Sequence, residues 1–262
     1  MYYVITSIIA LTLNLILTPL ILRLARARGW FDATGGRKIH IGDIPRLGGV
    51  GIAWSFAVAI VISLVFLSGL RNRIATPWPS LALIVGGFLT VHLMGLVDDF
   101  KPLRARYKLA FQLAVAAAIL AAGYRFRAVY LPFGIGELSL GLWSYPLTFF
   151  WIVGMLNAVN LIDGMDGLAA GVSLIVFAAY AFIAFKNNDV TAGAVSAALV
   201  GSVLGFLYYN FPKAGIFMGD SGSLLLGGAF AVLPLILEEP GRLGNGFIPA
   251  ATLSFISLTI PA

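Results

Sequence analysis

The chain has 262 residues, of which 60% are hydrophobic and only 11% are charged, and its mean hydropathy is +0.97. Soluble globular proteins are usually about 45–50% apolar and about 25% charged. So few charges cannot cover a water-exposed surface, which excludes a soluble fold, and the 13% aromatic content excludes disorder. The composition predicts an all-α polytopic membrane protein, and the absence of cysteine excludes disulfides and thiolate metal sites.

Long uncharged stretches divide the chain into candidate membrane spans. Spanning helices need about 20 apolar residues, with a range of about 17–25. Every stretch reaches this range except 109–124, which is about one residue short. The stretches are 1–22, 47–70, 74–97, 109–124, 138–162, 167–185, 190–212, 221–237 and 243–262. We therefore expect nine transmembrane helices in a single integral-membrane domain over residues 1–262.

Basic residues are distributed unevenly over the loops between these spans. Numbered from the N-terminus, the odd loops hold 11 of the 17 Lys and Arg residues and the even loops hold 6. Lys and Arg are enriched in cytoplasmic loops, so the bias places the odd loops in the cytoplasm and the N-terminus outside. The net charge of +6 then reflects cytoplasmic loops and indicates no nucleic-acid partner.

The segment 128–142 differs from the other even loops. It alternates apolar and polar residues around a centre rich in Pro and Gly, which is typical of a small external β-hairpin. An irregular interfacial loop is an equally good interpretation of the same residues.

Aspartates gather where spans end on the predicted cytoplasmic face. Two end the third span, two follow the fifth, and one begins the eighth; they are Asp98, Asp99, Asp163, Asp166 and Asp220. Five converging carboxylates would repel one another unless a cation lies among them. Oxygen ligands without a His or Cys cluster suit Mg²⁺ or Mn²⁺, so the sequence predicts a site for one of these ions.

Basic residues share these cytoplasmic loops with the aspartates. The first loop contributes Arg46, and the third contributes Lys101, Arg104, Arg106 and Lys108. Carboxylate-bound Mg²⁺ beside Lys and Arg is the combination that phosphoryl transfer needs, because the cations offset phosphate charge and a carboxylate can accept a proton. The alternative is that the basic residues only set the membrane topology.

Three glycine-containing motifs lie on the same predicted face. They are PRLGG at 45–49, NAVNLIDGMDG at 157–167 and FMGDSGS at 217–223. Glycine lets the backbone approach a ligand closely, and a Gly-rich turn at a helix N-terminus can bind an anion or a metal. Each motif alone is weak evidence, but the three together indicate one site.

Four long segments carry a family resemblance that covers nearly the whole chain. They read RKIHIGDIPRLGG, GLVDDFKPLRARYKLAFQ, NAVNLIDGMDGLAAG and NFPKAGIFMGDSGSLLLG. They resemble the bacterial polyprenyl-phosphate N-acetylhexosamine-1-phosphate transferases, a superfamily that includes the phospho-MurNAc-pentapeptide translocase. The resemblance implies transfer of a sugar-1-phosphate from a UDP-sugar to undecaprenyl phosphate, with release of UMP. It further implies Mg²⁺ or Mn²⁺, an active site on the cytoplasmic face of the bacterial inner membrane, and a tenth helix in the complete fold.

The resemblance also assigns roles to individual residues. Asp98 resembles the base that deprotonates or orients the lipid phosphate, with Asp99 beside it, and Asp163 lies in the same catalytic motif. Lys108 resembles the lysine that holds a substrate phosphate, while Asp220 and Asn160 resemble the metal ligands. The remaining candidates are substrate-binding: Gly164, Met165 and Asp166 as the uridine wall, Phe217 as the uracil-stacking aromatic, and His40 and Arg46 in the first loop.

The sugar can be argued only within this superfamily. The form RKIH…PRLGG resembles the branch that transfers GlcNAc-1-phosphate for O-antigen, teichoic acid or enterobacterial common antigen. The MurNAc-pentapeptide branch typically reads KxGTPTMGG at this place. Members that use UDP-FucNAc or UDP-QuiNAc share the same motifs, so those sugars stay open.

The C-terminal end departs from the family pattern. The family has a His-rich cytoplasmic loop after the ninth span, whereas this chain ends at Ala262 and contains two histidines, His40 and His92. We expect a fragment rather than a naturally short relative. His92 lies in the middle of a span, where a packing role is expected before a ligand role.

Two other classes of membrane protein fit the sequence less well. A cation-coupled transporter would place acids near the bilayer midplane and often has two related halves, and neither feature is visible. A CDP-alcohol phosphotransferase would continue its Asp-Gly segment with Ala-Arg and two further aspartates, and the sequence after Asp163 does not. Members of the resembling family often form homodimers, although no residue pattern here marks a dimer face.

Overall fold

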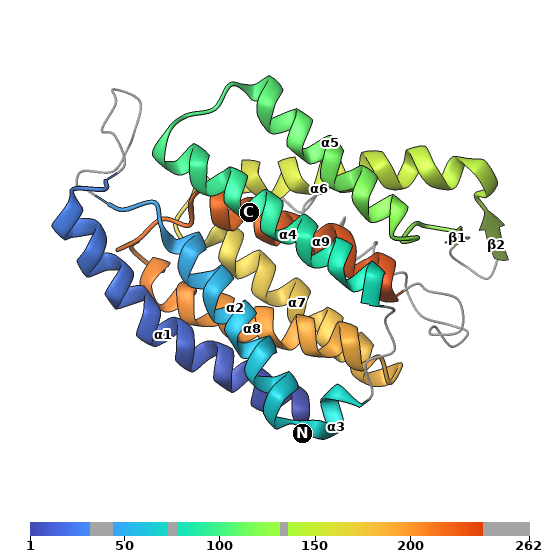
Figure 1. Ribbon diagram of the computed structural model, residues 1–262, viewed down its shortest axis with the longest axis horizontal. Helices are drawn as coiled ribbons and strands as arrows, with labels where there is room; N and C mark the ends of the chain where they lie inside the picture. The colour runs from blue at the N-terminus through green and yellow to red at the C-terminus, as the bar shows by residue number, and fades with distance from the viewer. Residues whose placement is uncertain (32–43, 73–77, 132–135, 238–262) are drawn as a thin grey trace.

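A computed structural model describes residues 1–31, 44–72, 78–131 and 136–237 (Figure 1). Within these ranges the chain is helical apart from one small two-stranded sheet. The helices are α1 (Tyr2–Arg28), α2 (Gly48–Phe66), α3 (Ser68–Arg71), α4 (Trp78–Phe100), α5 (Ala105–Ala121), α6 (Ser144–Ile162), α7 (Leu168–Lys186), α8 (Val190–Asn210) and α9 (Gly219–Leu237). The strands are β1 (Ala128–Leu131) and β2 (Gly136–Ser139).

Seven of the described helices are long and apolar enough to cross a membrane, namely α1, α2, α4, α6, α7, α8 and α9. The chain is therefore a multi-pass membrane protein, as its composition predicts. The expected nine spans are confirmed only in part. The stretch 109–124 forms most of α5, whose 17 residues extend about 26 Å and fall short of the roughly 30 Å hydrocarbon core. The stretch 243–262 lies outside the described residues.

The hairpin between α5 and α6 is confirmed. β1 and β2 pair antiparallel, with Ala128 opposite Ser139 and Leu131 opposite Gly136. The residues between the two strands, 132–135, lie outside the described ranges. The hairpin lies at the right-hand end of the bundle in Figure 1, away from the end where α9 begins.

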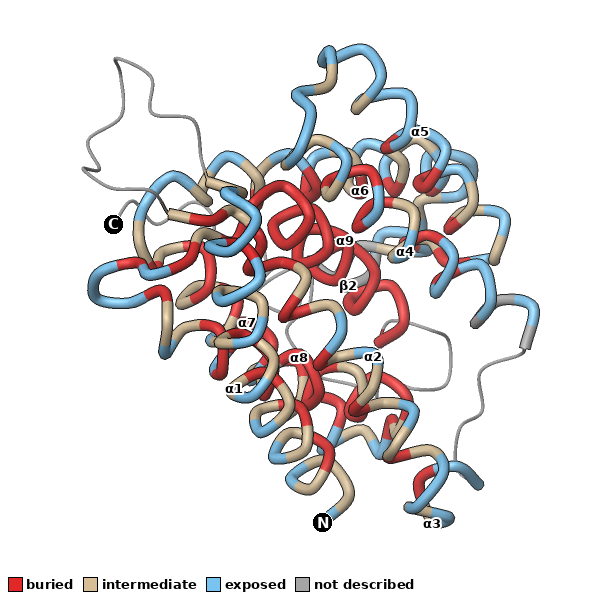
Figure 2. Tube along the Cα trace, turned by 60° about the vertical axis from the view of Figure 1, so that its left-hand side comes forward, coloured by how far each residue is buried: buried red, intermediate tan, exposed pale blue. Residues whose placement is uncertain are grey.

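Helix α9 forms the centre of the bundle. All of its residues are buried, and the other helices surround it (Figure 2). A Cβ at Gly227 would lie 2.9 Å from the Leu156 Cα atom, so this glycine lets α9 and α6 touch at backbone level. The Trp151 indole then donates a hydrogen bond of 3.1 Å to the Ala231 carbonyl, which ties the same two helices.

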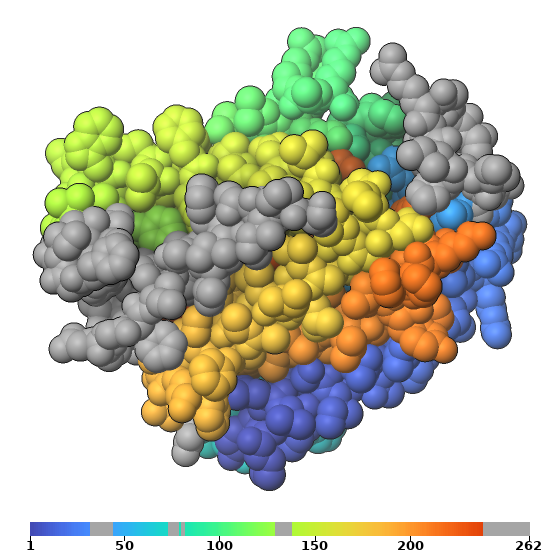
Figure 3. Space-filling view, turned by 180° about the vertical axis from the view of Figure 1, so that it is seen from behind, coloured from blue at the N-terminus to red at the C-terminus, as the bar shows by residue number. Residues whose placement is uncertain are grey.

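Helices α1, α2 and α8 form a second packed group. A Cβ at Gly201 would clash with the Ser7 carbonyl, so α8 needs glycine to lie against α1. Asn14 donates to the Ser55 hydroxyl at 3.2 Å, which links α1 to α2 through buried polar groups. Seen from behind, α7 and α8 fill the face between α6 and α1 (Figure 3).

The direction of the helices brings the predicted site residues to one end of the bundle. Helices α4 and α6 end there, while α2, α5 and α9 begin there, at the left in Figure 1. Ion pairs between side chains of α4, α5 and α9 confirm that these helix ends lie together. The prediction that the acids at these ends share one face is thus confirmed. Which side of the membrane that face occupies stays a prediction.

Candidate active site

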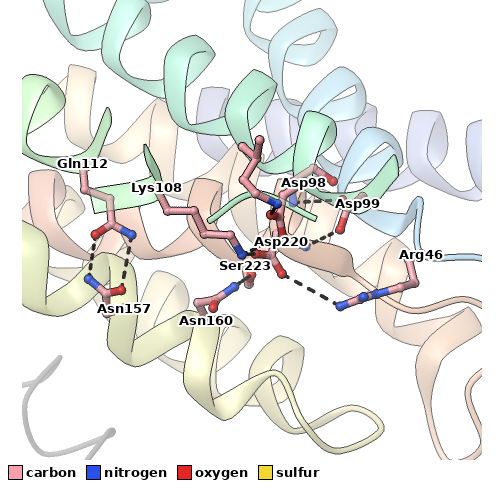
Figure 4. A network of polar contacts seen from close by, with 11 residues as sticks. Arg46, Asp98, Asp99, Lys108, Gln112, Asn157, Asn160, Asp220 and Ser223 are labelled. Carbon is pink, nitrogen blue, oxygen red and sulfur yellow. Dashed lines mark hydrogen bonds and ion pairs between the residues drawn. The ribbon is translucent and has the colours of Figure 1, made fainter. Parts of the chain in front are cut away.

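A lysine lies between two carboxylates at this end of the bundle (Figure 4). The Lys108 Nζ atom is 2.6 Å from an Asp98 oxygen and 2.7 Å from an Asp220 oxygen. Three helices supply these groups, because Asp98 lies near the end of α4, Lys108 in the first turns of α5 and Asp220 in the first turn of α9. Burial lowers the pKa of Lys108, but the hydrogen bonds and charges of Asp220 and Asp98 outweigh burial and raise it overall. The lysine therefore stays protonated and supplies a positive charge between the acids.

The second oxygen of each carboxylate has its own partner. The other Asp98 oxygen accepts a hydrogen bond of 2.6 Å from the Leu103 backbone amide, which fixes the carboxyl group against the α4–α5 loop. The other Asp220 oxygen is 3.9 Å from the Arg46 guanidinium, whose side chain is 40% exposed. The structure thus brings the predicted residues Asp98, Lys108, Asp220 and Arg46 into one cluster with an open side at the arginine.

Asn160 joins the cluster from the last turn of α6. Its amide group donates to the Ser223 hydroxyl at 2.8 Å, and it lies close enough to hydrogen bond to the Asp220 carboxylate. The two residues predicted as metal ligands therefore lie side by side. Ser223, one turn after Asp220 on α9, was not singled out from the sequence, although it belongs to the quoted FMGDSGS motif.

Asp99 has a different environment from its neighbour Asp98. Its two carboxylate oxygens accept hydrogen bonds from the backbone amides of Asp220, at 2.7 Å, and Ser221, at 3.1 Å. A carboxylate at this place satisfies amides that have no partner within the helix and interacts favourably with the N-terminal end of the helix dipole. The structure therefore places Asp99 against the backbone of α9 and away from Lys108.

Two of the glycine motifs pair through their backbones beside this cluster. The Phe217 amide donates to the Pro45 carbonyl at 2.8 Å, and the Gly48 and Gly49 amides donate to the Phe217 and Met218 carbonyls at 2.9 and 2.7 Å. The PRLGG and FMGDSGS segments thus form one short backbone ladder. A Cβ at Gly49 would meet the backbone of Gly222, which explains why both motifs carry glycine at the contact.

The third glycine motif forms the connection between α6 and α7. Asp163 ends α6 in a half-buried position, and burial raises the pKa of its carboxyl to about 8; Arg46 opposes this effect, whereas Asp220 and Asp99 add to it. The Asp166 carboxylate accepts a hydrogen bond of 3.0 Å from the Ala214 amide, so it holds the loop that leads to α9. Gly164 and Met165 are exposed at this surface.

Phe217 lies half-buried in the ladder described above, and His40 lies outside the described residues. The uridine-binding roles predicted for Gly164, Met165, Asp166, Phe217 and His40 therefore stay predictions.

Comparison with known proteins identifies the family. The sequence profile of the family described as "Glycosyl transferase family 4" matches residues 80–238, which is more than half of the chain and includes most of α4 and all of α5 to α9. The chain belongs to glycosyl transferase family 4. This membership confirms the resemblance drawn from the four sequence segments.

Several named bacterial proteins are similar to the chain. It is 39% identical over 233 residues to a Bacillus subtilis protein named "Probable undecaprenyl-phosphate N-acetylglucosaminyl 1-phosphate transferase", covering 89% of this chain and 62% of that relative. It is 40% identical over 251 residues to a Thermoanaerobacter protein named "Phospho-N-acetylmuramoyl-pentapeptide-transferase", covering 90% of this chain and 76% of that relative. A Lactobacillus acidophilus protein with the same name is 33% identical, with 93% and 79% covered. The chain therefore spans about three fifths of the length of the first relative.

The donor atoms of this glycosyl transferase family 4 site suit a hard cation. Within the described ranges, no group of three or more His, Cys, Asp or Glu side chains could hold a metal ion by itself. The available donors are the carboxylates of Asp98 and Asp220, the Asn160 side-chain oxygen and the Ser223 hydroxyl. Mg²⁺ prefers such all-oxygen sets and usually takes only one or two protein carboxylates, with substrate phosphates completing its shell. The residues fit Mg²⁺ or Mn²⁺, and Lys108 supplies the positive charge between the carboxylates.

A further pair of polar residues was missed by sequence reasoning. Gln112 and Asn157 exchange side-chain hydrogen bonds of 2.8 and 3.3 Å between α5 and α6. Gln112 lies one turn after Lys108, and Asn157 lies one turn before Asn160, so the pair lies beside the cluster, at the left in Figure 4. The available signal was that Gln112 is the single glutamine of the chain and lies in an otherwise apolar stretch.

Proposed function

We propose that this chain is the core of an enzyme that transfers a sugar-1-phosphate from a UDP-sugar to undecaprenyl phosphate and releases UMP. The reaction takes place at the cytoplasmic face of the bacterial inner membrane and is the first membrane step of cell-envelope polysaccharide synthesis. The observation that supports this proposal is the Lys108 ammonium held between Asp98 and Asp220 at one end of a bundle of apolar helices. Membership of glycosyl transferase family 4 and the similarity to a protein named "Probable undecaprenyl-phosphate N-acetylglucosaminyl 1-phosphate transferase" support the same chemistry.

The transfer is an in-line displacement at phosphorus. An oxygen of undecaprenyl phosphate attacks the β-phosphorus of the UDP-sugar, and the bond from that phosphorus to the bridging oxygen breaks, so that UMP leaves with the bridging oxygen. Such a reaction needs positioning and charge stabilisation more than covalent chemistry. When bound by Asp220 and Asn160, a Mg²⁺ or Mn²⁺ ion neutralises charge on the pyrophosphate.

Lys108 and Asp98 act together on the lipid phosphate in this proposal. The lysine binds both carboxylates in the structure, and an entering phosphate competes for its ammonium group. Transfer of Lys108 to the phosphate releases the Asp98 oxygen that the lysine contacts. This oxygen then accepts the proton of the lipid phosphate, while the Leu103 amide holds the other oxygen in place.

The nucleotide binds beside the cluster, where the α6–α7 connection meets the 45–49 segment. Arg46 is 3.9 Å from Asp220 and its side chain is partly exposed, which suits contact with a diphosphate. Gly164, Met165 and Asp166 form the uridine wall, Phe217 stacks on uracil, and His40 contributes from the first loop. A homodimer is compatible with this arrangement, since each copy carries a whole cluster.

GlcNAc-1-phosphate is the group that we propose the enzyme transfers. The support is the PRLGG segment, which pairs with the backbone beside Asp220 and differs from the form typical of the MurNAc-pentapeptide branch. The experiment is an assay of the complete protein in detergent with undecaprenyl phosphate, Mg²⁺ and a panel of UDP-activated GlcNAc, FucNAc, QuiNAc and MurNAc-pentapeptide. We expect lipid-linked GlcNAc-1-phosphate and UMP in equal amounts. Transfer of a different sugar would change only the identity of the transferred group. The absence of a lipid product with every donor would contradict the proposed function.

A further inference from the structure

One face of α4 lies against the first turn of α9. His92, Gly95 and Asp99 are spaced i, i+3 and i+7, which places them in one row along the helix. Each of the three meets the backbone of Asp220 or Ser221. Asp220, the proposed metal ligand, therefore lies in a turn of α9 that α4 contacts through three successive residues of this row.

Asp99 holds the amide groups of this turn. Its carboxylate accepts from the Asp220 and Ser221 amides, so both oxygens face α9. Gly219 begins the turn with φ of +74°, and a Cβ there would lie 2.6 Å from each oxygen of Asp99. Glycine at this position is thus needed both for the backbone conformation and for the approach of the carboxylate.

Gly95 sets the distance between the two helices. A Cβ added to this residue would lie 2.5 Å from both the Asp220 carbonyl carbon and the Ser221 nitrogen. Both atoms belong to backbone, which cannot rotate away as a side chain could. Any larger residue here must push α4 and α9 apart.

His92 holds the carbonyl side of the same turn. Its Nδ1 atom is 3.1 Å from the Ser221 carbonyl oxygen, and the side chain is only 7% exposed. Because a carbonyl can only accept, Nδ1 must carry the hydrogen. The expected packing histidine is therefore also a hydrogen-bond donor to the α9 backbone.

We infer that the row His92, Gly95 and Asp99 positions Asp220 by holding the first turn of α9, and that Asp99 is a positioning residue rather than the base. The effect of this row on catalysis depends on the proposed function. The two adjacent aspartates then have separate tasks, because Asp98 faces the Lys108 ammonium while Asp99 faces backbone amides. Groups that orient a metal ligand commonly change metal affinity or activity by about 10–100-fold when they are removed.

The test compares two glycines of α4. Gly95→Ala forces the helices apart, whereas Gly86→Ala is the matched control, since a Cβ at Gly86 meets nothing within 4 Å. Two readouts are used on the complete protein in detergent: hydrogen–deuterium exchange of the 217–223 segment without metal, and the Mg²⁺ concentration that gives half-maximal transfer. We expect Gly95→Ala to speed exchange in this segment and to raise the half-saturating Mg²⁺ concentration about tenfold or more. Gly86→Ala should leave both unchanged.

Milder variants keep the test informative if Gly95→Ala does not fold. Asp99→Ala removes both hydrogen-bond acceptors, and Asp99→Asn replaces one acceptor with an NH₂ group that cannot accept from a backbone amide. Both variants should therefore speed hydrogen exchange and raise the half-saturating Mg²⁺ concentration. His92→Leu should do so by a smaller factor, and His92→Gln should recover part of the loss, since the glutamine amide can still donate to the Ser221 carbonyl.

The outcomes separate the inference from the proposed function. If the wild-type protein transfers sugar phosphate but Asp99→Asn lowers only kcat, with exchange and Mg²⁺ saturation as in the wild type, Asp99 is a base and the inference is overturned. If exchange responds as expected but the wild-type protein transfers no sugar phosphate, the helix contact stands and the proposed function fails.

Discussion

The crossing of α4 with α9 and the contact of α5 with α6 hold the two halves of the charged cluster in different ways. At the first, backbone meets backbone, because Gly95 and Gly219 remove the side chains that would separate the helices. At the second, side chain meets side chain: the amides of Gln112 and Asn157 hydrogen bond to each other, and apolar residues of α5 such as Val115 and Ile119 are buried in the core. The acid of α9 is thus held by close backbone packing, while the helix that carries the lysine meets α6 through side chains.

This difference suits the chemistry proposed for each residue. A metal ligand must keep its geometry through the reaction, and close backbone packing provides that rigidity. A lysine that exchanges carboxylates for a phosphate must move, and its ammonium lies on a flexible four-carbon stem. We therefore expect substitution of the acid on α9 to abolish the reaction, and substitutions at the contact of α5 with α6 to weaken it.

Asp220→Ala should have the largest effect, because it removes the fixed carboxylate from the cluster and leaves Lys108 with Asp98 alone. We expect metal-dependent UMP release to fall by about a thousandfold, as for loss of a major electrostatic group in an active site. The measurement is UMP release by the complete protein over a range of Mg²⁺ concentrations. Turnover at the wild-type level would show that Asp220 is not the metal ligand.

Asp98→Asn removes the proposed base at the junction of the two halves. The asparagine can still accept from the Leu103 amide but cannot take a proton, so we expect kcat to fall about a hundredfold or more. The KM for the UDP-sugar should change little, because the proposed nucleotide site lies on the Arg46 side of the cluster. Steady-state kinetics with both substrates measures the two constants, and an unchanged kcat would remove Asp98 as the base.

Gln112→Ala and Asn157→Ala weaken the hold on α5 and should have smaller effects. Each loses the same reciprocal pair of hydrogen bonds, so we expect activity to fall up to about tenfold in either single variant. The double variant should be as active as either single variant, because all three variants lose the same interaction. Leu113→Ala is the control, because its side chain is exposed on the same helix. Fully additive losses would contradict a shared contact.

Asp163→Asn should affect the dependence of stability on pH. Without metal, burial raises the pKa of Asp163 to about 8, so the folded protein keeps a proton that the unfolded chain, with a pKa of 3.8, has released. Stability therefore falls as pH rises from about 4 to about 8. Asparagine cannot ionise, so the melting temperature of the variant relative to wild type should increase between pH 6 and pH 8.5 in chelator. Added Mg²⁺ should shrink this difference, and a difference independent of pH would refute the assignment.

The sequence predicts which end of the bundle carries the site, because the position of a residue within a span shows at which end of that helix it lies. Asp98, Asp163 and Asp220 follow from the parity of the spans, and the hairpin follows from its alternation. The family resemblance assigns the base to Asp98, but span positions alone do not separate Asp98 from Asp99. Which of the two side chains faces Lys108 depends on the rotation of α4 about its axis, and α4 packs through Gly95 against α9. Nor does the sequence show that Gln112 and Asn157 meet, because they belong to helices separated by the hairpin.

The most direct test of the account follows the β-phosphorus of the donor. The complete protein is incubated with undecaprenyl phosphate, Mg²⁺ and UDP-GlcNAc labelled with ³²P at the β-phosphate, and lipid and water-soluble products are separated. The account predicts that the label moves into the lipid, with one unlabelled UMP released for each labelled lipid, and that Asp220→Ala abolishes both. Label retained in released UDP, with only the sugar moved to the lipid, would contradict transfer of a sugar-1-phosphate.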